Sequence, residues 1–170
     1  MIEGAPRPEG FVYSPWLTAN LVIEKPPEEV AWDNVIYDSP TLGYVVATHM
    51  SLRSFIDRSV WTFYWSLADR PPAEMRELLL QKDWAYWREA ILHDLSRAHP
   101  DIRDRVSRLD VMRLGHAMAR PIPGFLETRR NFANRGPIFY ANSDLSGFSI
   151  FEEAQYRGVT AADRALASGL

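Results

Sequence analysis

The sequence predicts an α+β fold with a mostly antiparallel sheet, one long amphipathic helix packed on it, and a C-terminal strand-turn-helix. Three observations carry this prediction. Residues 16–67 contain short apolar runs separated by turn residues, which is typical of antiparallel strands. From Pro71 to about His99 the apolar spacing changes to three or four residues, which indicates a helix. After residue 138, an apolar run, a polar turn and an amphipathic segment follow one another.

Length and composition favour a single domain that spans residues 1–170, with residues 1–13 as an extended arm. The chain is 46% hydrophobic, which is enough to bury one substantial core. Two prolines and two glycines among the first ten residues argue against a folded start.

Charge and cysteine content exclude several classes of function. The formal net charge is −3 with no long run of one sign, so nothing indicates binding to nucleic acid or to an anionic membrane. The lack of cysteine excludes disulfides, thiolate metal sites and dithiol redox chemistry, and it fits a cytoplasmic protein. We expect no membrane insertion, because the sequence has neither a secretion signal nor an apolar run of about 20 residues.

Three or four strands are expected in the first half of the chain. Each is a short apolar or alternating run bounded by turn residues. Within the last strand Trp61, Phe63 and Trp65 alternate, so they share one face. That face either packs in the core or lines an apolar ligand cavity, and both interpretations stay open. The expected strands are residues 16–24, 35–37, 43–49 and 60–67.

The helical segment after Pro71 carries a tryptophan pair. Trp84 and Trp87 lie on its apolar face and are expected in the core. Asp83 could instead cap a second helix after a short first one, so one continuous helix is not required. The apolar face comprises Leu80, Trp84, Trp87, Ile91 and Leu95.

The second half of the chain adds smaller elements. Pro100 restarts the chain as a short helix, residues 107–118 alternate like a strand, and residues 125–132 are expected to be helical. Residues 138–141 form the apolar run that we expect to be a strand, and the amphipathic segment continues to Leu166.

The start of the last helix is predicted from its capping residues. Ser149 followed by Glu152 has the spacing of a capping box, and Phe148 and Phe151 could anchor the start of the helix. Glu152 and Glu153 point about 100° apart, so capping and solvation are favoured over a catalytic carboxylate pair. Free backbone N–H groups at this helix start would suit an anionic or electron-rich ligand.

His116 is a candidate ligand-binding residue. It lies between Gly115 and Ala117, just before the proline-rich turn 121–124, and its small neighbours leave room for a ligand. A hydrogen-bonded core histidine is the alternative interpretation. The four histidines are too dispersed to indicate a metal site. The chain has no GxGxxG, Walker, HExxH or GxSxG motif.

Four segments carry a family resemblance: AWDNVIYDSPTLGYVVATHMSLR, TFYWSL, DVMRLGHAMARPIPG and IFYANSDLSGFSIFEEAQYRGVTAADRAL. Together they resemble the C-terminal part of FAD-dependent oxidoreductases of the flavin-containing amine oxidase superfamily, over residues 14–166. The resemblance implies the substrate-binding and flavin-capping part of a flavoprotein. In it, Ala141–Asp144 resembles the family's acid motif, and Phe148–Ala154 resembles the start of a helix that meets the flavin ring.

The resemblance also implies site residues. Backbone groups of Ile150 and Phe151 would approach the pyrimidine side of the isoalloxazine ring, and Ser143 or Asp144 would approach the ribityl chain. His116 falls where the family chain passes the substrate face of the flavin, which makes it the candidate catalytic residue. The implied cofactor-binding residues are Asn142, Ser143, Asp144, Ser149, Ile150 and Phe151.

Two departures from the family pattern shape the expected function. Glu153 stands where many members carry glycine, and the family's N-terminal glycine-rich dinucleotide-binding βαβ unit has no counterpart here. FAD is therefore expected to be absent or weakly bound in this chain alone, and the chain is expected to be inactive alone. A dinucleotide-binding domain is one expected partner, and a homodimer is the other expected assembly.

Three hypotheses follow. The first is a C-terminal fragment or truncated homologue of an FAD-dependent oxidoreductase. It would contribute substrate-side and flavin-ring contacts, while the complete enzyme moves a hydride from a C–N or similar C–H bond of a small-molecule substrate to the flavin. The alternative is a non-catalytic ligand-binding or oligomerising module derived from that fold. The third is an unrelated α+β domain that encloses an aromatic pocket.

Overall fold

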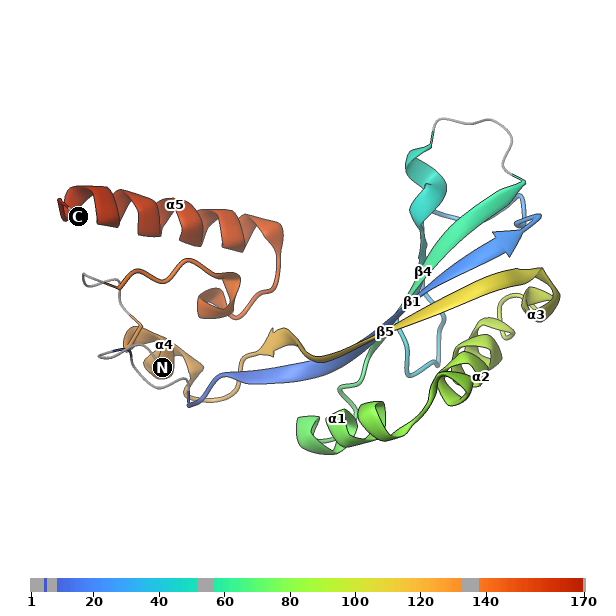
Figure 1. Ribbon diagram of the computed structural model, residues 1–170, viewed down its shortest axis with the longest axis horizontal. Helices are drawn as coiled ribbons and strands as arrows, with labels where there is room; N and C mark the ends of the chain where they lie inside the picture. Colours follow the sequence, from blue (N-terminus) through green and yellow to red (C-terminus); the bar gives the residue numbers. More distant parts are fainter. Residues whose placement is uncertain (1–4, 6–8, 52–56, 133–137, 170) are drawn as a thin grey trace. The chain divides into compact units, whose positions relative to one another are not determined.

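The computed structural model describes residues 5, 9–51, 57–132 and 138–169. It confirms the α+β class, with a five-stranded antiparallel sheet and helices (Figure 1). The chain divides into two compact units. We call Pro15–Gly115 the sheet unit, and Met1–Ser14 together with His116–Leu170 the terminal unit. Each unit is described by itself.

The sheet has the strand order β2-β3-β4-β1-β5. The two long inner strands, β1 and β4, are antiparallel, and their register places Leu17 opposite Trp65 and Leu21 opposite Trp61. Strand β3 pairs with the other side of β4 and carries β2 at the edge. The strands are β1 (Val12–Glu24), β2 (Asp33–Asn34), β3 (Gly43–Val46), β4 (Arg58–Ser66) and β5 (Val106–Arg120).

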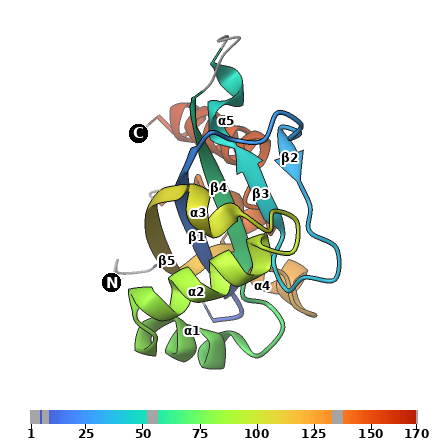
Figure 2. The same cartoon turned by 90° about the vertical axis from the view of Figure 1, so that its right-hand side faces the viewer.

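Three helices cover one face of the sheet in the sheet unit (Figure 2). They are α1 (Pro72–Gln81), α2 (Trp84–Leu95) and α3 (Ile102–Arg105). Alternation along β1 and β4 sends every second side chain towards these helices. Burying each large apolar side chain there contributes roughly 2 kcal/mol. The most buried core residues include Leu17, Leu21, Ile23, Trp61, Phe63, Leu67, Leu79, Trp87, Ile91, Leu92 and Leu95.

The helical segment is two helices, so the prediction of one long helix is wrong and the alternative with a cap at Asp83 is confirmed. The Asp83 carboxylate accepts a hydrogen bond from the Tyr86 backbone N–H at 2.9 Å. The tryptophan pair also separates. Trp87 is buried in the core, whereas Trp84 is 53% exposed in the first turn of α2 and its indole N–H donates to the Leu109 carbonyl.

The loop before β3 differs from the sequence prediction. Residues 35–37 form no strand, and Ile36 alone among them is buried; the short strand β2 comes just before them. Gly43 explains the close approach of the neighbouring backbone, because a Cβ there would lie 2.0 Å from the Asn34 carbonyl oxygen. Strand β3 is shorter than expected, because the 3₁₀ turn η1 (Ala47–Met50) follows Val46.

The terminal unit contains α4 (Phe125–Arg130), the 3₁₀ turn η2 (Ser143–Ser146) and the long helix α5 (Phe151–Ala167). The expected helix at 125–132 and the expected last helix are confirmed. The expected strand at 138–141 is wrong, because Ile138 forms only an isolated bridge. Residues 1–4 and 6–8 of the expected arm lie outside the described residues, and Val12 begins β1.

The helix start in the terminal unit also differs from the prediction. Helix α5 begins at Phe151 with Ile150 as its N-cap residue, and no side chain caps it, so the predicted capping box is wrong. The expected aromatic anchor is wrong as well, since Phe148 and Phe151 are 62% and 75% exposed.

Candidate functional site

The turn η2 carries the acidic residue of the expected site. Asp144 is half-buried, and its Oδ2 accepts a hydrogen bond from the Tyr13 hydroxyl at 2.7 Å. Tyr13 comes from the start of β1, so a residue near the N-terminus holds a residue near the C-terminus. Burial raises the pKa of Tyr13 to about 12, and the hydrogen bond to Asp144 and the negative charge of Asp144 act in the same direction. The Tyr13 hydroxyl therefore remains a donor at neutral pH.

Tyr13 also connects Asp144 with the candidate catalytic histidine. His116 is exposed on β5, and its ring meets the Tyr13 ring edge-on with 6.2 Å between the ring centroids. His116 is therefore not a buried core histidine. Two of the sequence-predicted residues, His116 and Asp144, therefore meet the same tyrosine, one at its ring and the other at its hydroxyl.

Ser149 has a different role from the predicted one. Instead of capping α5, its hydroxyl oxygen accepts a hydrogen bond from the Ala119 backbone N–H of β5 at 3.2 Å. This contact ties the segment before α5 to the strand that carries His116. The backbone N–H groups of Phe151 and Glu152 in the first turn of α5 consequently receive no side-chain cap, and they remain available to a ligand.

The remaining sequence-predicted residues surround this helix start. Asn142 is exposed and Ser143 is half-buried at the beginning of η2. Ile150 is 49% exposed and Phe151 is 75% exposed. These apolar side chains at an uncapped helix start offer a surface for an apolar ring whose edge carries hydrogen-bond acceptors.

Arg157 fixes η2 against α5. Its Nε donates to the hydroxyl oxygen of Ser146 at 2.7 Å, and its Nη2 donates to the Leu145 carbonyl at 3.4 Å. Gly147 ends the turn with φ of +77°, and a Cβ there would lie 2.7 Å from the Pro121 ring. The turn that carries Asp144 is therefore held from both sides.

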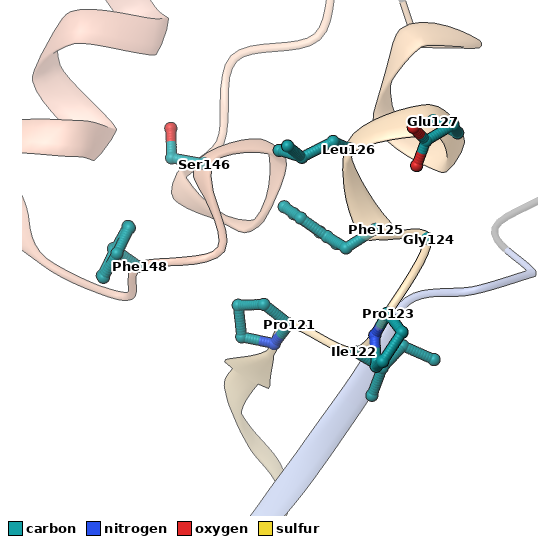
Figure 3. A pocket seen from close by; sticks show the side chains of 9 residues that line it. All are labelled: Pro121, Ile122, Pro123, Gly124, Phe125, Leu126, Glu127, Ser146 and Phe148. Carbon is teal, nitrogen blue, oxygen red and sulfur yellow. The ribbon is translucent and has the colours of Figure 1, made fainter.

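A cavity of about 380 Å³ lies beside this turn. Figure 3 shows Ser146 and Phe148 on one side of the pocket and the segment that contains Ile122 and Glu127 on the other. Its walls are largely apolar, and Glu127 is the ionisable residue among them. Sequence reasoning noted the proline-rich turn beside His116 but not this pocket. The lining residues are Pro121, Ile122, Pro123, Gly124, Phe125, Leu126, Glu127, Ser146 and Phe148.

The sheet unit contains a buried polar cluster that the sequence did not predict. The buried carboxylate of Asp94 in α2 accepts hydrogen bonds from Ser39 at 2.8 Å, Thr41 at 2.7 Å and Arg97 at 3.3 Å. Arg97 also donates to the carbonyl oxygens of Tyr37 and Asp38. These contacts attach the loop after β2 to the end of α2.

A cavity of about 420 Å³ borders this polar cluster, and Trp65 and His93 contribute to its wall. Trp61 and Phe63 are fully buried, so the core interpretation is confirmed for these two members of the aromatic row. Trp65 is the member of the row that lines this cavity.

A second polar pair joins buried Tyr44 of β3 to half-buried His99. The Tyr44 hydroxyl lies 2.6 Å from His99 Nε2, and the Tyr44 ring stacks on Trp61 with 4.2 Å between centroids. Burial raises the pKa of Tyr44 to about 12 and lowers the pKa of His99 below its usual 6.5. Asp101 opposes the shift of the His99 pKa, and Arg105 adds to it. The pair is uncharged at neutral pH, and its histidine lies at the edge of the core.

Among the residues that the structure describes, no group of three or more histidine, cysteine or carboxylate side chains could hold a metal ion. Within the same residues, no helix has the length and apolar character to cross a membrane.

Comparisons with known proteins add no family. No family model matches the chain, and no curated protein matches it.

Two features of the terminal unit offer hydrogen-bonding groups of the kind that the flavin end of FAD requires. The uncapped start of α5 suits the electron-rich edge of an isoalloxazine ring, and the Asp144 carboxylate can accept hydrogen bonds from ribityl hydroxyls. For the diphosphate and adenine, the described residues offer no glycine-rich strand-turn-helix unit.

Proposed function

We propose that this chain is the substrate-side and flavin-capping part of an FAD-dependent oxidoreductase of the amine oxidase type. The observation that supports it is the joint geometry of η2 and α5. A carboxylate held by Tyr13 lies on a turn that Arg157 fastens to α5, and the first turn of α5 has no side-chain cap. Together they provide acceptors for hydroxyl groups and donors for ring oxygen and nitrogen atoms.

His116 would face the substrate in this proposal. Its imidazole is exposed, and Tyr13 supports one side of the ring. A bound FAD would supply the redox chemistry by accepting a hydride from a C–H bond of a small-molecule substrate. The chain itself would bind and orient the ring and the substrate, and a dinucleotide-binding domain would hold the other end of the cofactor.

Titration with flavins tests the proposal. We expect the chain to quench riboflavin fluorescence with a dissociation constant in the micromolar range and to bind FAD no more tightly than riboflavin, because nothing described here holds the adenine end. A chain that binds neither flavin at hundreds of micromolar contradicts the proposal.

A matched pair of variants isolates the helix start. Phe151→Pro removes one backbone N–H where proline suits the first helical position, and the extended conformation of Ile150 tolerates a following proline. Phe151→Ala removes the same ring but keeps the N–H. We expect Phe151→Pro to bind riboflavin about fivefold more weakly than Phe151→Ala, which corresponds to one lost hydrogen bond. Equal affinities would show that the helix start does not meet the flavin.

A second function, as an oligomerising module, is favoured by the exposed apolar side chains of α5. Phe151, Val159 and Leu166 are 75%, 55% and 78% exposed, and helical spacing places them within about 80° of arc. Such a stripe is typical of a helix that packs against another protein surface.

A further inference from the structure

We propose that Tyr13 is a positioning residue for Asp144: by bonding one carboxylate oxygen, it presents the other oxygen to a hydroxyl group of the bound ligand. The inference rests on the proposed function, which makes that hydroxyl part of the ribityl chain of a flavin. Tyr13 lies outside every motif that carries the resemblance.

The geometry of the carboxylate supports this role. The hydrogen bond of 2.7 Å from Tyr13 occupies Oδ2, and within the described residues no side chain donates to Oδ1. A carboxylate can accept about four hydrogen bonds, so Oδ1 keeps its full capacity. Asp144 is half-buried, which leaves it open to a ligand.

The tyrosine is itself held in place. It lies in β1 with its ring edge-on to His116, and Phe11, two residues earlier, is edge-on to Phe125 with 5.7 Å between the ring centroids. A group fixed on a strand restricts the rotamers of the side chain that it binds, and this lowers the entropy that a ligand must remove.

A simple structural staple between β1 and η2 is the competing explanation. Loss of such a staple would lower the stability of the fold, and it would lower the affinity for all ligands of the site alike. Positioning of Asp144 predicts selective loss, because only a ligand with a polyol chain uses the free oxygen. Riboflavin and lumiflavin make this comparison possible, since lumiflavin has the same ring without the ribityl chain.

The experiment measures fluorescence quenching of both flavins by the full chain and its variants. We expect Tyr13→Phe to weaken riboflavin binding about fivefold and to leave lumiflavin binding within twofold. Asp144→Asn should show the same selectivity, and the double variant should lose no more than either single variant. Tyr37→Phe is the control, because the Tyr37 side chain is 85% exposed.

Equal weakening of both flavins, no weakening of either, or additive losses in the double variant would overturn the positioning role. If the unaltered chain binds neither flavin, the proposed function fails. The orientation of Asp144 is then judged in the free protein from its side-chain carboxylate ¹³C resonance. A change in the Asp144 carboxylate chemical shift in Tyr13→Phe but not in Tyr37→Phe supports the proposal that Tyr13 orients Asp144. An unchanged chemical shift in Tyr13→Phe overturns it.

Discussion

His99 links the stability of the sheet unit to pH. When its proton is on Nδ1, neutral His99 accepts a hydrogen bond from the Tyr44 hydroxyl at Nε2. Protonation of Nε2 removes that acceptor. Burial lowers the pKa of the folded histidine below 6.5, so the unfolded chain takes up a proton first as the pH falls. The stability that His99 contributes is thus fully present above about pH 6.5 and is lost as the pH falls from there towards the pKa of the folded state.

His99→Gln tests this pH dependence. Glutamine keeps a carbonyl acceptor for Tyr44 and does not titrate, so we expect the free energy of unfolding to decline less steeply below pH 6.5 than in the unaltered chain. Urea unfolding at a series of pH values measures the slope. His93→Gln is the control, because His93 is exposed at the end of α2. An unchanged slope in His99→Gln would show that another group causes the acid sensitivity.

Single residues also show how far sequence reasoning reaches. His116 was a candidate because small residues flank it, whereas Asp144 was a candidate only because the family resemblance implied it. Tyr13 was not, because its hydrogen bond to Asp144 joins positions 131 residues apart, and local patterns do not contain such pairings. Ser149 was misassigned for a related reason: a serine with capping spacing bonded instead to a strand distant in sequence.

At the scale of elements, the break between α1 and α2 depends on Asp83. Its carboxylate satisfies a backbone N–H that α2 cannot satisfy internally. Asp83→Ala should lower the free energy of unfolding by about 1 kcal/mol, which corresponds to a fall in melting temperature of roughly 3 °C. Circular dichroism during heating measures this fall.

Asp69→Ala is the control for the lost negative charge, because Asp69 forms only a long, exposed ion pair with Arg70. An equal change in both variants would show that charge, rather than capping, accounts for the effect.

Elements differ in how well periodicity predicts them. Strands β1 and β4 and helix α2 were predictable because their alternation or helical spacing reflects one buried face. The apolar composition of residues 138–141 predicted a strand, but in the structure only Ile138 forms a bridge and residues 139–141 pair with no strand. Helix α5 was predictable from amphipathic spacing, although Ala161 is its one buried residue in the structure.

At the scale of the whole molecule, exposed apolar residues on α5 predict association. We expect the chain to self-associate with rising concentration when no partner is present, and sedimentation velocity measures this. The double variant Val159→Ser and Leu166→Ser should weaken association about tenfold or more, since each substitution removes an apolar side chain from the shared surface.

Met50→Ser controls for lost surface hydrophobicity, because Met50 is 84% exposed but lies in η1 of the sheet unit. A chain that stays monomeric at hundreds of micromolar would contradict an apolar docking role for α5. Association that Met50→Ser weakens equally would place the contact elsewhere.

The polar cluster around Asp94 has a consequence for how the sheet unit opens. Thr41 donates its backbone N–H to Ser39, and Gly43 donates to Thr41, while both hydroxyls bind Asp94. The loop and the last turn of α2 are therefore joined by hydrogen bonds. If the loop unfolded locally, the buried Asp94 carboxylate would lose its donors, and if the end of α2 unfolded, the Ser39 and Thr41 hydroxyls would lose their acceptor. We therefore expect the amide protons of this loop to be protected from exchange together with those of the core helix α2.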